Sequence, residues 1–391
     1  MNQAMKQTIA AFTMLACGLL AGYATAQELK PDKRFTQWDS NKDGKLTREE
    51  LPERNRKNFG RVDTDKDGFI SLREHLTFVG RLPRNRNQAR QPRAPQGVKI
   101  EKNIAYAGTD NPRQTLDLAL PEKRTTDKPL AVIAYIHGGG WRQGSKEGGL
   151  NRLNTYLKTG RYVGVSIGYR LSGEVKWPEQ LYDCKAAIRW LKANSKKYGF
   201  DPKRIAVYGT SAGGHLVAML GVTGHRKDLE GELGPYKDYS GRVAAVLDYF
   251  GPTQFLLMNS KPTRMDHDAA DSPESLLIGG AIQENRKKTL HAAPMSYISP
   301  KACPFLIVHG TKDVLVPVHQ SEILDKALDK NEVESIFIRI EGGGHGVRGA
   351  PLDQAGLAFL DKHFWGKETQ LADKTVQNSD LRAKRGEKQS K

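Results

Sequence analysis

The sequence is poor in cysteine and has few long apolar runs. Its 391 residues include only three Cys, too few for a disulfide-built scaffold and too scattered for a zinc cluster. Hydrophobic residues make up 38% of the chain and charged residues 27%, which excludes a polytopic membrane protein and a wholly disordered chain. The length gives room for two or three domains, one of them with a large core.

The formal net charge is +17, but much of it lies in two segments without apolar periodicity. Residues 81–97 hold five Arg and no acidic residue, and residues 366–391 hold seven Lys or Arg against four acidic residues. We interpret the first as an Arg-rich linker and the second as a disordered basic tail. Neither has interleaved aromatic residues, so we expect no nucleic-acid partner, whereas weak contact with anionic polymers remains open.

Residues 1–26 have the pattern of a secretory signal peptide. Lys6 precedes an apolar run over residues 9–20, and an A-x-A site ends at Ala26. The run is short for a bilayer span. We therefore expect cleavage after Ala26 and a secreted or periplasmic protein that is not an integral membrane protein. Lipidation at Cys17 is the alternative, although the residues before it match a lipoprotein box poorly.

Residues 27–80 contain two twelve-residue segments that repeat at an interval of 24 residues. Both match the EF-hand loop, with short oxygen-bearing side chains at positions 1, 3 and 5, Gly at position 6 and Glu at position 12. The candidate calcium ligands are Asp39, Asn41, Asp43, Lys45, Thr47 and Glu50 in the first loop and Asp63, Asp65, Asp67, Phe69, Ser71 and Glu74 in the second. At position 7, Lys45 and Phe69 would supply only their carbonyls.

The repetition favours bound Ca²⁺ over two acidic turns that bind nothing. Leu46 and Ile70 follow position 7 of each loop, and we expect them to pair across the two loops. We interpret the pair as a structural or interaction module rather than a switch.

From about residue 98, short β-rich runs alternate with helical stretches. Continuous apolar strands between helices indicate an α/β fold with a mostly parallel sheet covered on both faces. The expected strands cover residues 115–120, 130–136, 162–169, 205–208, 243–250, 305–308 and 335–340. The expected helices cover about 150–159, 179–197, 212–221, 319–330 and 352–364. We expect Cys184 and Cys303 in the core, and their spacing leaves a disulfide between them open.

One motif joins an expected strand to an expected helix. The sequence GTSAG at residues 209–213 follows strand 205–208 and opens helix 212–221, as in the nucleophile elbow G-x-S-x-G. Its glycines permit a strained turn that exposes the hydroxyl of Ser211 at the helix N-terminus. Ser211 is therefore the candidate nucleophile.

A second motif, HGGGW at residues 137–141, ends strand 130–136. An HGGG loop places main-chain N–H groups close to a developing oxyanion. The candidate oxyanion donors are the N–H groups of Gly138, Gly139 and Ala212. We expect His137 to orient this loop rather than to transfer protons.

The candidate acid and base follow two later strands. Asp313 lies after strand 305–308 and His345 after strand 335–340, so the order Ser, Asp, His is the one typical of this fold. His345 would accept the proton of Ser211, and Asp313 would hold the imidazole in the required tautomer. Asp248 is the main rival acid, but it lies in the middle of a strand. The chain has no HExxH or comparable spacing, so we expect catalysis without a cofactor.

Together, HGGGW, GTSAGG, HGTKD and GGGHG resemble the α/β-hydrolase superfamily over residues 98–365. Within it, the chain is similar to secreted bacterial esterase/lipase-type enzymes of the hormone-sensitive-lipase-like and feruloyl-esterase-like groups. The resemblance implies a serine carboxylic-ester hydrolase with Ser211, Asp313 and His345 as its triad. It also implies carboxylic ester substrates, among them acetyl or feruloyl esters of polysaccharides. The EF-hand pair is not a general feature of these enzymes.

Two other functions remain as alternatives. A peptidase of the prolyl-oligopeptidase type shares the fold and the triad order, but it usually carries a propeller that the front of this chain is too short to encode. A non-catalytic, calcium-dependent binding protein would need no complete nucleophile system. Residues 253–300 are expected to form a cap, either as a surface insertion or as a substrate pocket, and Trp141 and Tyr208 are candidates for that pocket or for packing.

Overall fold

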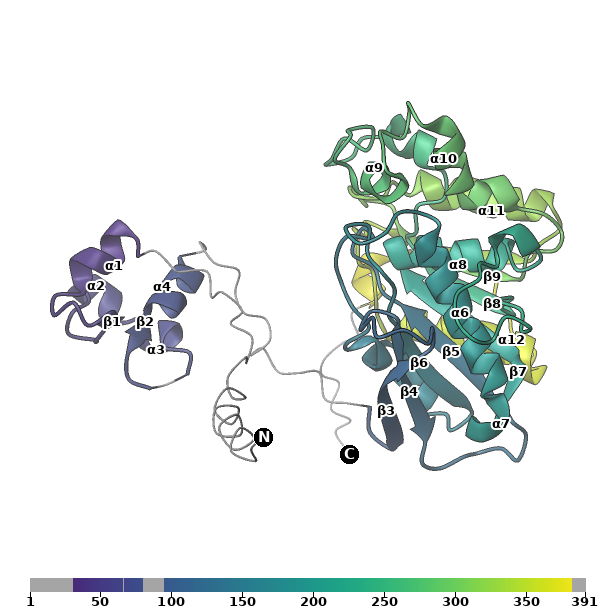
Figure 1. The fold of residues 1–391 in the computed structure, drawn as a ribbon, viewed down its shortest axis with the longest axis horizontal. Helices are drawn as coiled ribbons and strands as arrows, with labels where there is room; N and C mark the ends of the chain where they lie inside the picture. Colours follow the sequence, from purple (N-terminus) through teal and green to yellow (C-terminus); the bar gives the residue numbers. More distant parts are fainter. Residues whose placement is uncertain (1–30, 66, 80–94, 382–391) are drawn as a thin grey trace, which may run out of the picture. The chain divides into compact units, whose positions relative to one another are not determined.

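The computed structural model describes residues 31–65, 67–79 and 95–381. The chain divides into two compact units, residues 1–91 and 92–391 (Figure 1). The segment interpreted as a signal peptide lies outside the described residues, so cleavage after Ala26 stays a prediction. Within the described ranges, no helix has the length and apolarity needed to cross a bilayer.

The first unit consists of short helices joined by two loops. The helices are α1 (Lys33–Trp38), α2 (Glu53–Arg56), α3 (Phe59–Val62) and α4 (Leu72–Phe78). Strands β1 (Lys45–Leu46) and β2 (Ile70–Ser71) pair antiparallel and place Leu46 opposite Ile70, as predicted. Both side chains are buried in a small core with Phe35, Leu51 and Val62, so apolar packing fixes the register of the two loops.

The second unit is built on a nine-stranded sheet with the order β11-β10-β9-β8-β7-β5-β6-β4-β3. Its strands are β3 (Val98–Ala105), β4 (Thr115–Pro121), β5 (Leu130–Ile136), β6 (Tyr162–Ile167), β7 (Phe200–Thr210), β8 (Ala245–Tyr249), β9 (Phe305–Gly310), β10 (Ser335–Glu341) and β11 (Lys374–Gln377). The pairs β3–β4 and β4–β6 are antiparallel, and the other six pairs are parallel. Every residue of β5, β6, β8 and β9 is buried, which explains their continuous apolar runs.

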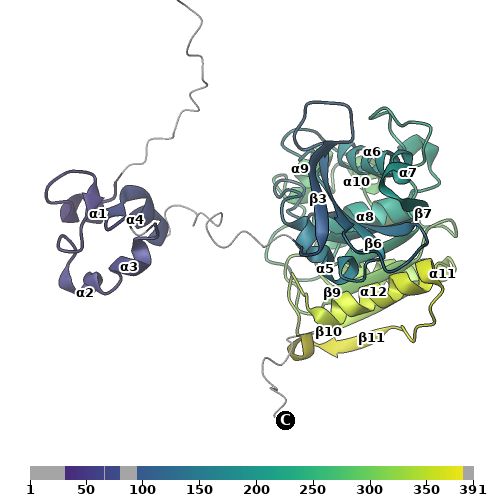
Figure 2. The same ribbon diagram turned by 90° about the horizontal axis from the view of Figure 1, so that it is seen from below.

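Helices cover both faces of this sheet (Figure 2). One core cluster includes residues of α6 (Glu179–Ala193), α8 (Ala212–Val222) and α11 (His319–Lys330). The other includes residues of α5 (Asn154–Leu157) and α12 (Ala350–Trp365). The remaining helical turns are η1 (Gly149–Leu153), α7 (Ser195–Tyr198) and η2 (Lys227–Leu229). The predicted α/β architecture is confirmed.

The segment between β8 and β9 forms a cap of short helices. These are η3 (Phe255–Ser260), α9 (Pro273–Ile278), α10 (Arg286–His291) and η4 (Pro294–Tyr297). The Nε2–H of His215, on α8, donates to the carbonyl oxygen of Ala292 at 2.6 Å. Burial lowers the pKa of His215 to about 4, so its imidazole is neutral at pH 7. The cap is therefore tied directly to the helix that follows the elbow.

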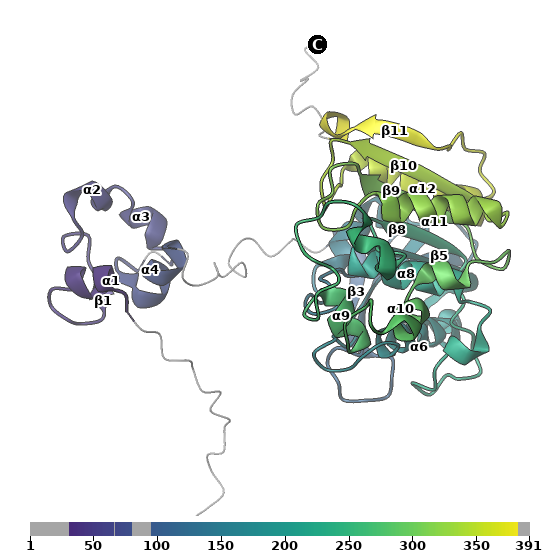
Figure 3. The same cartoon turned by 90° about the horizontal axis from the view of Figure 1, so that it is seen from above.

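The expectation of a disordered tail from residue 366 is wrong for residues up to 381. Strand β11 pairs in parallel with β10 (Figure 3), and η5 (Asn378–Leu381) buries Leu381 in the core. Asp373 Oδ1 also accepts a hydrogen bond from the N–H of Phe337 on β10, at 2.8 Å. Val376 is the one apolar residue of β11, and it is half-buried. The strand is therefore held mainly by main-chain hydrogen bonds, and such bonds leave no pattern in the side chains.

The two cysteines among the described residues of the second unit are both buried and free. Burial raises the pKa of the Cys303 thiol to about 12 and also raises that of the Cys184 thiol well above its ordinary value. Both thiols are therefore protonated core side chains, and the disulfide that the sequence left open is not formed.

Candidate active site

Ser211 lies in a sharp turn between β7 and α8. Its backbone has φ 57° and ψ −124°, a region that residues other than Gly rarely adopt. A Cβ atom at Gly209 would lie 2.1 Å from the carbonyl oxygen of Gly213, so the turn closes only with Gly at this position. The N–H of Ser211 donates to the carbonyl oxygen of Tyr249 on β8 at 2.9 Å. The predicted strand, turn and helix are all present, with Ser211 at the apex.

The glycine loop after β5 packs against this turn. A Cβ atom at Gly138 would lie 2.6 Å from the carbonyl oxygen of Thr210 and 3.2 Å from the Cβ of Ser211. The main chain therefore approaches the serine more closely than any residue with a side chain would allow. Gly139 has φ 115°, again outside the range of other residues.

His137 fixes the conformation of the glycine loop. Its Nδ1–H donates to the carbonyl oxygen of Gly138 at 2.8 Å, and its own carbonyl accepts from the hydroxyl of Tyr169 at 2.9 Å. The two rings stack with their centroids 4.2 Å apart. Burial lowers the pKa of His137 to about 4, so the side chain is neutral at pH 7. These contacts agree with the expected orienting role.

Asp313 and His345 are in direct contact. The distance between His345 Nδ1 and Asp313 Oδ2 is 2.7 Å. The other carboxylate oxygen, Oδ1, accepts from the N–H groups of Leu315 at 2.8 Å and Val316 at 3.0 Å. Burial by itself raises the pKa of Asp313, but hydrogen bonds from His309 and His345 outweigh it and hold the pKa well below its ordinary range. The carboxylate is therefore ionised at any pH near neutrality.

A second histidine, His309, lies behind the same carboxylate. Its Nε2 is 3.2 Å from Asp313 Oδ2 and 2.8 Å from the carbonyl oxygen of Val316, and its Nδ1 accepts from the hydroxyl of Ser321 at 2.7 Å. From the sequence, we did not expect this residue in the site. The signal that could have revealed it is the spacing of four residues between His309 and Asp313.

Ser211 and His345 open into the same cavity, which has a volume of about 800 Å³. The glycine loop, Trp141 and the cap residues Met265 and Pro273 also line it. Tyr208 does not line it; its ring packs in the core against Tyr135 and Tyr249, with centroid distances of 5.3 and 4.8 Å. Of the two aromatic residues considered as pocket walls, Trp141 is one and Tyr208 is not.

The cap adds a buried ion pair to the cavity wall. His267 Nδ1 is 3.0 Å from Glu274 Oε2, and its Nε2–H donates to the carbonyl oxygen of Leu315 at 3.0 Å. Burial lowers the pKa of His267, but its bonds to Glu274 and Leu315 outweigh burial and raise it. Because the N–H of Leu315 binds Asp313, this pair ties the cap to the loop that carries the candidate acid. No sequence spacing indicated the contact.

The rival acid, Asp248, lies elsewhere. It is fully buried in the middle of β8, and its Oδ1 accepts from the N–H of Gly251 at 3.0 Å. Burial raises its pKa to about 7. In the part of the chain that the structure describes, it forms no hydrogen bond with a histidine, so it lacks the geometry of a base-orienting carboxylate.

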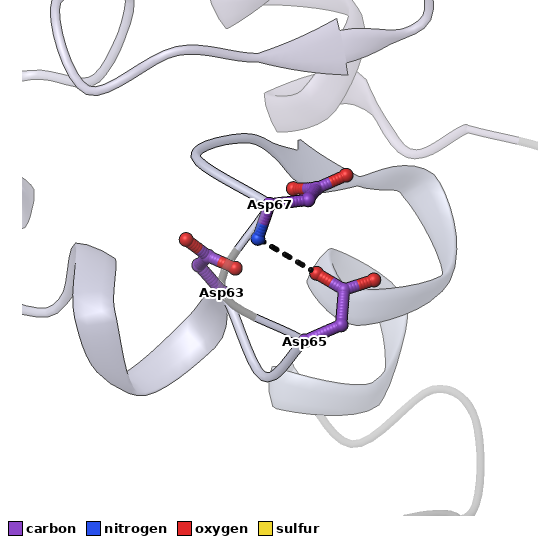
Figure 4. Close-up of side chains that lie close together, drawn as sticks. All are labelled: Asp63, Asp65 and Asp67. Atoms are coloured by element: carbon purple, nitrogen blue, oxygen red, sulfur yellow. Dashed lines mark hydrogen bonds between the residues drawn. The ribbon is translucent and has the colours of Figure 1, made fainter.

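The second EF-hand loop gathers three carboxylates. One side-chain oxygen from each of Asp63, Asp65 and Asp67 lies within 4.8 Å of the other two, and Figure 4 shows the three side chains side by side. The N–H of Asp67 donates to Asp65 Oδ1 at 3.2 Å, while the buried Oδ1 of Asp63 has no hydrogen-bond partner among the described residues. Glu74, at position 12, has its pKa lowered by hydrogen bonds from Ser71 and Thr64, which outweigh burial. This all-oxygen donor set fits a hard cation such as Ca²⁺.

The first loop has a similar hydrogen-bond pattern, but its carboxylates, all among the described residues, do not form a cluster within 4.8 Å like that of the second loop. Asp39 Oδ1 and Asn41 Oδ1 both accept from the N–H of Asp43, at 3.1 and 2.9 Å. A hydrogen bond from the N–H of Thr47 is the main cause that lowers the pKa of Glu50 to about 2. Its carboxylate therefore stays ionised. At position 7 of the two loops, Lys45 Nζ lies over the ring of Phe69, 4.9 Å from its centroid. Neither side chain contains an oxygen, so these residues could bind a cation only through their main-chain carbonyls.

Four features together define an α/β-hydrolase. They are the mostly parallel sheet, the elbow between β7 and α8, the glycine loop after β5, and the Asp–His pair after β9 and β10. The described first unit matches the family model for the EF hand over residues 32–52 and 57–78. The second unit matches the family model BD-FAE over residues 116–328, and the chain belongs to this family. The predicted combination of an α/β-hydrolase with a preceding EF-hand pair is confirmed.

Several known relatives of the chain carry the name esterase. It is 31% identical over 262 residues to Esterase LipC of Mycobacterium tuberculosis, with 65% of this chain and 63% of LipC covered. Across LipC and two further mycobacterial esterases, LipM and LipQ, the match spans 63%, 43% and 45% of the relative's length.

Solved structures show the same domain. One is a truncated form of a carbohydrate esterase from gut microbiota, with a TM-score of 0.64, 31% identity, and 69% of this chain and 97% of that chain covered. Another is a bifunctional GH43-CE protein of Bacteroides eggerthii, with a TM-score of 0.63, 32% identity, and coverage of 68% of this chain and 38% of that chain.

Proposed function

We propose that this protein hydrolyses carboxylic esters through an acyl-enzyme, with Ser211 as nucleophile. The observation that carries the proposal is the Asp313–His345 hydrogen bond of 2.7 Å, beside a cavity that Ser211 also lines. The strained elbow holds the serine where a substrate carbonyl would enter. Membership of an esterase-rich family supports the same reaction.

The mechanism follows from the roles of these groups. Asp313 accepts the Nδ1–H of His345, which leaves Nε2 free to take the proton of Ser211 as Oγ attacks the carbonyl carbon. The N–H groups of Gly138, Gly139 and Ala212 would hold the oxyanion, a type of contact worth on the order of 10²–10³ in kcat. The imidazolium then protonates the leaving alcohol. Water, activated by the same base, releases the acid.

For the substrate, we propose esters on carbohydrate, with acetyl and feruloyl groups as the first candidates. One solved relative, 31% identical to this chain, is a carbohydrate esterase by title. The cavity of about 800 Å³ has the size of sites that enclose ligands larger than a simple acetyl ester.

We also propose that the two EF-hand loops bind Ca²⁺ through Asp39, Asn41, Asp43 and Glu50 and through Asp63, Asp65, Asp67 and Glu74. Thr47, Ser71 and the carbonyls of Lys45 and Phe69 would complete the two sets. When bound, the ion would neutralise the clustered carboxylates and cross-link each loop. A secreted or periplasmic location, with cleavage after Ala26, belongs to the same proposal because calcium is abundant outside cells.

The test compares the wild-type chain with Ser211→Ala on 4-nitrophenyl acetate. The proposal predicts turnover by the wild type and loss of roughly 10³-fold or more in kcat in the variant. Equal rates would refute it, and hydrolysis of peptides but not of esters would favour the peptidase alternative. A panel of acetylated and feruloylated oligosaccharides then identifies the ester class.

A further inference from the structure

Three arginines line the cavity and have no part in the proposed mechanism. Arg142 follows the glycine loop, Arg152 lies in η1, and Arg348 lies between His345 and the start of α12. All three side chains are exposed. They come from three separate segments of the chain, so a single charged helix face does not account for them.

These guanidinium groups have no protein partner. Across residues 31–65, 67–79 and 95–381, none of the three side chains forms a hydrogen bond or an ion pair. Other arginines of the same unit do: Arg161 pairs with Asp361 at 2.9 Å, and Arg170 pairs with Asp183 at 2.8 Å.

The carboxyl group of Asp353 lies near enough to Arg152 for the arginine charge to affect its pKa. Arg152 acts to lower the pKa of Asp353, although burial outweighs it and raises the pKa. The two side chains form no ion pair, so the donors of Arg152 remain available.

The cavity wall offers little to cancel this charge. Glu274 is the acidic residue among those that line it, and its carboxylate is already paired with His267 at 3.0 Å. The side chains of Glu274 and His267 are 4% and 2% exposed, so a solvent-facing arginine cannot readily replace that partner. The cavity is therefore positively charged beside the candidate nucleophile.

We propose that the enzyme selects esters that carry a carboxylate close to the scissile bond. A guanidinium group presents paired N–H donors that match both oxygens of a carboxylate, which a neutral substrate cannot use. This inference rests on the proposed function and narrows its substrate class.

The test uses two pairs of esters that differ in charge and little in shape. For the alcohol side the pair is 4-acetoxybenzoate and 4-acetoxybenzamide; for the acyl side it is mono-4-nitrophenyl adipate and its neutral methyl ester. The full-length protein should favour the anionic member of at least one pair by roughly tenfold or more in kcat/KM, the effect of one charge-assisted hydrogen bond. Repeating the assay at a salt concentration of about 0.5 M should reduce this preference, because salt screens exposed charges.

The variant Arg142→Gln/Arg152→Gln/Arg348→Gln should bring that ratio to about one. Arg286→Gln is the matched control, because Arg286 is exposed on α10 of the cap and does not line the cavity. It should keep the wild-type ratio, and thermal unfolding midpoints confirm that both variants fold.

Two results would overturn the inference: cleavage of the neutral esters with no preference for charge in either pair, or a preference that survives in the triple variant. Failure to cleave any of the four esters would instead count against the proposed function, and the inference would fall with it.

Discussion

The choice between two buried aspartates is the most informative single comparison in this molecule. Asp313 is hydrogen-bonded to His345, whereas Asp248 forms no hydrogen bond with a histidine among the described residues. Replacing each with Asn keeps its size and its acceptor oxygen, so the pair separates a catalytic carboxylate from a merely buried one.

Asp313→Asn should abolish most activity without changing the fold. The Asn Oδ1 can still accept from the N–H groups of Leu315 and Val316, but its NH₂ group then faces His345 Nδ1. A donor in that position forces the imidazole proton onto Nε2, which can no longer accept the proton of Ser211. The expected loss is about 10⁴-fold in kcat, measured with 4-nitrophenyl acetate.

Asp248→Asn should leave kcat within about threefold of wild type, because its Oδ1 can keep the hydrogen bond from Gly251. Its effect should appear in stability. An acid whose pKa is raised in the folded state binds its proton more tightly there, so the folded state loses stability as pH rises from about 4 to about 7. The variant should lack this loss, worth up to about 4 kcal/mol, in urea titrations across that range.

The two variants together can refute this account. If Asp313→Asn keeps more than a tenth of wild-type kcat, the carboxylate does not orient the base. If Asp248→Asn is as inactive as Asp313→Asn while still folded, the acid has been assigned to the wrong strand end.

Further predictions concern the oxyanion loop, the chain end and the calcium loops. Gly138→Ala should lower kcat by about 10²-fold because its Cβ would lie 2.6 Å from Thr210 O, whereas Gly173→Ala, with no atom within 4 Å of its Cβ, should have no effect on 4-nitrophenyl acetate turnover. A chain ending at residue 372 should lose about 2 kcal/mol through Leu381 alone, seen as a fall of about 4–8 °C in Tm; an unchanged Tm would show that β11 and η5 add nothing. Calorimetry of the full chain should detect two calcium sites with Kd of roughly 10⁻⁴–10⁻³ M, and Glu50→Gln/Glu74→Gln should remove both; binding that persists in this variant would contradict the ligand sets.

The candidate site residues could be chosen from the sequence because each of them follows an expected strand. Ser211, Asp313 and His345 each lie just after an apolar run that becomes a buried strand. Parallel strands bring their carboxyl ends to one edge of the sheet, so three residues far apart in the sequence were expected to meet there. The candidate calcium ligands could be chosen in the same way because each set lies within one short loop.

Contacts between remote segments were not predictable in the same way. The pair His267–Glu274 reaches Leu315 from the cap, and only the folded path of the cap brings these groups together. Strand β3 alternates polar and apolar residues at a solvated edge, and β11 has almost no apolar signal. Strands held by main-chain pairing at the edge of a sheet leave little trace in side-chain pattern.

The central claim is that Ser211 forms a covalent bond with the acyl group. The most direct measurement treats the protein with a 4-nitrophenyl phosphonate and follows nitrophenolate release together with intact mass and peptide mapping. The account predicts release of one equivalent, one adduct per chain located on Ser211, loss of esterase activity in proportion, and no adduct in Ser211→Ala. Inactivation with the adduct on another residue, or full esterase activity in Ser211→Ala, would contradict it.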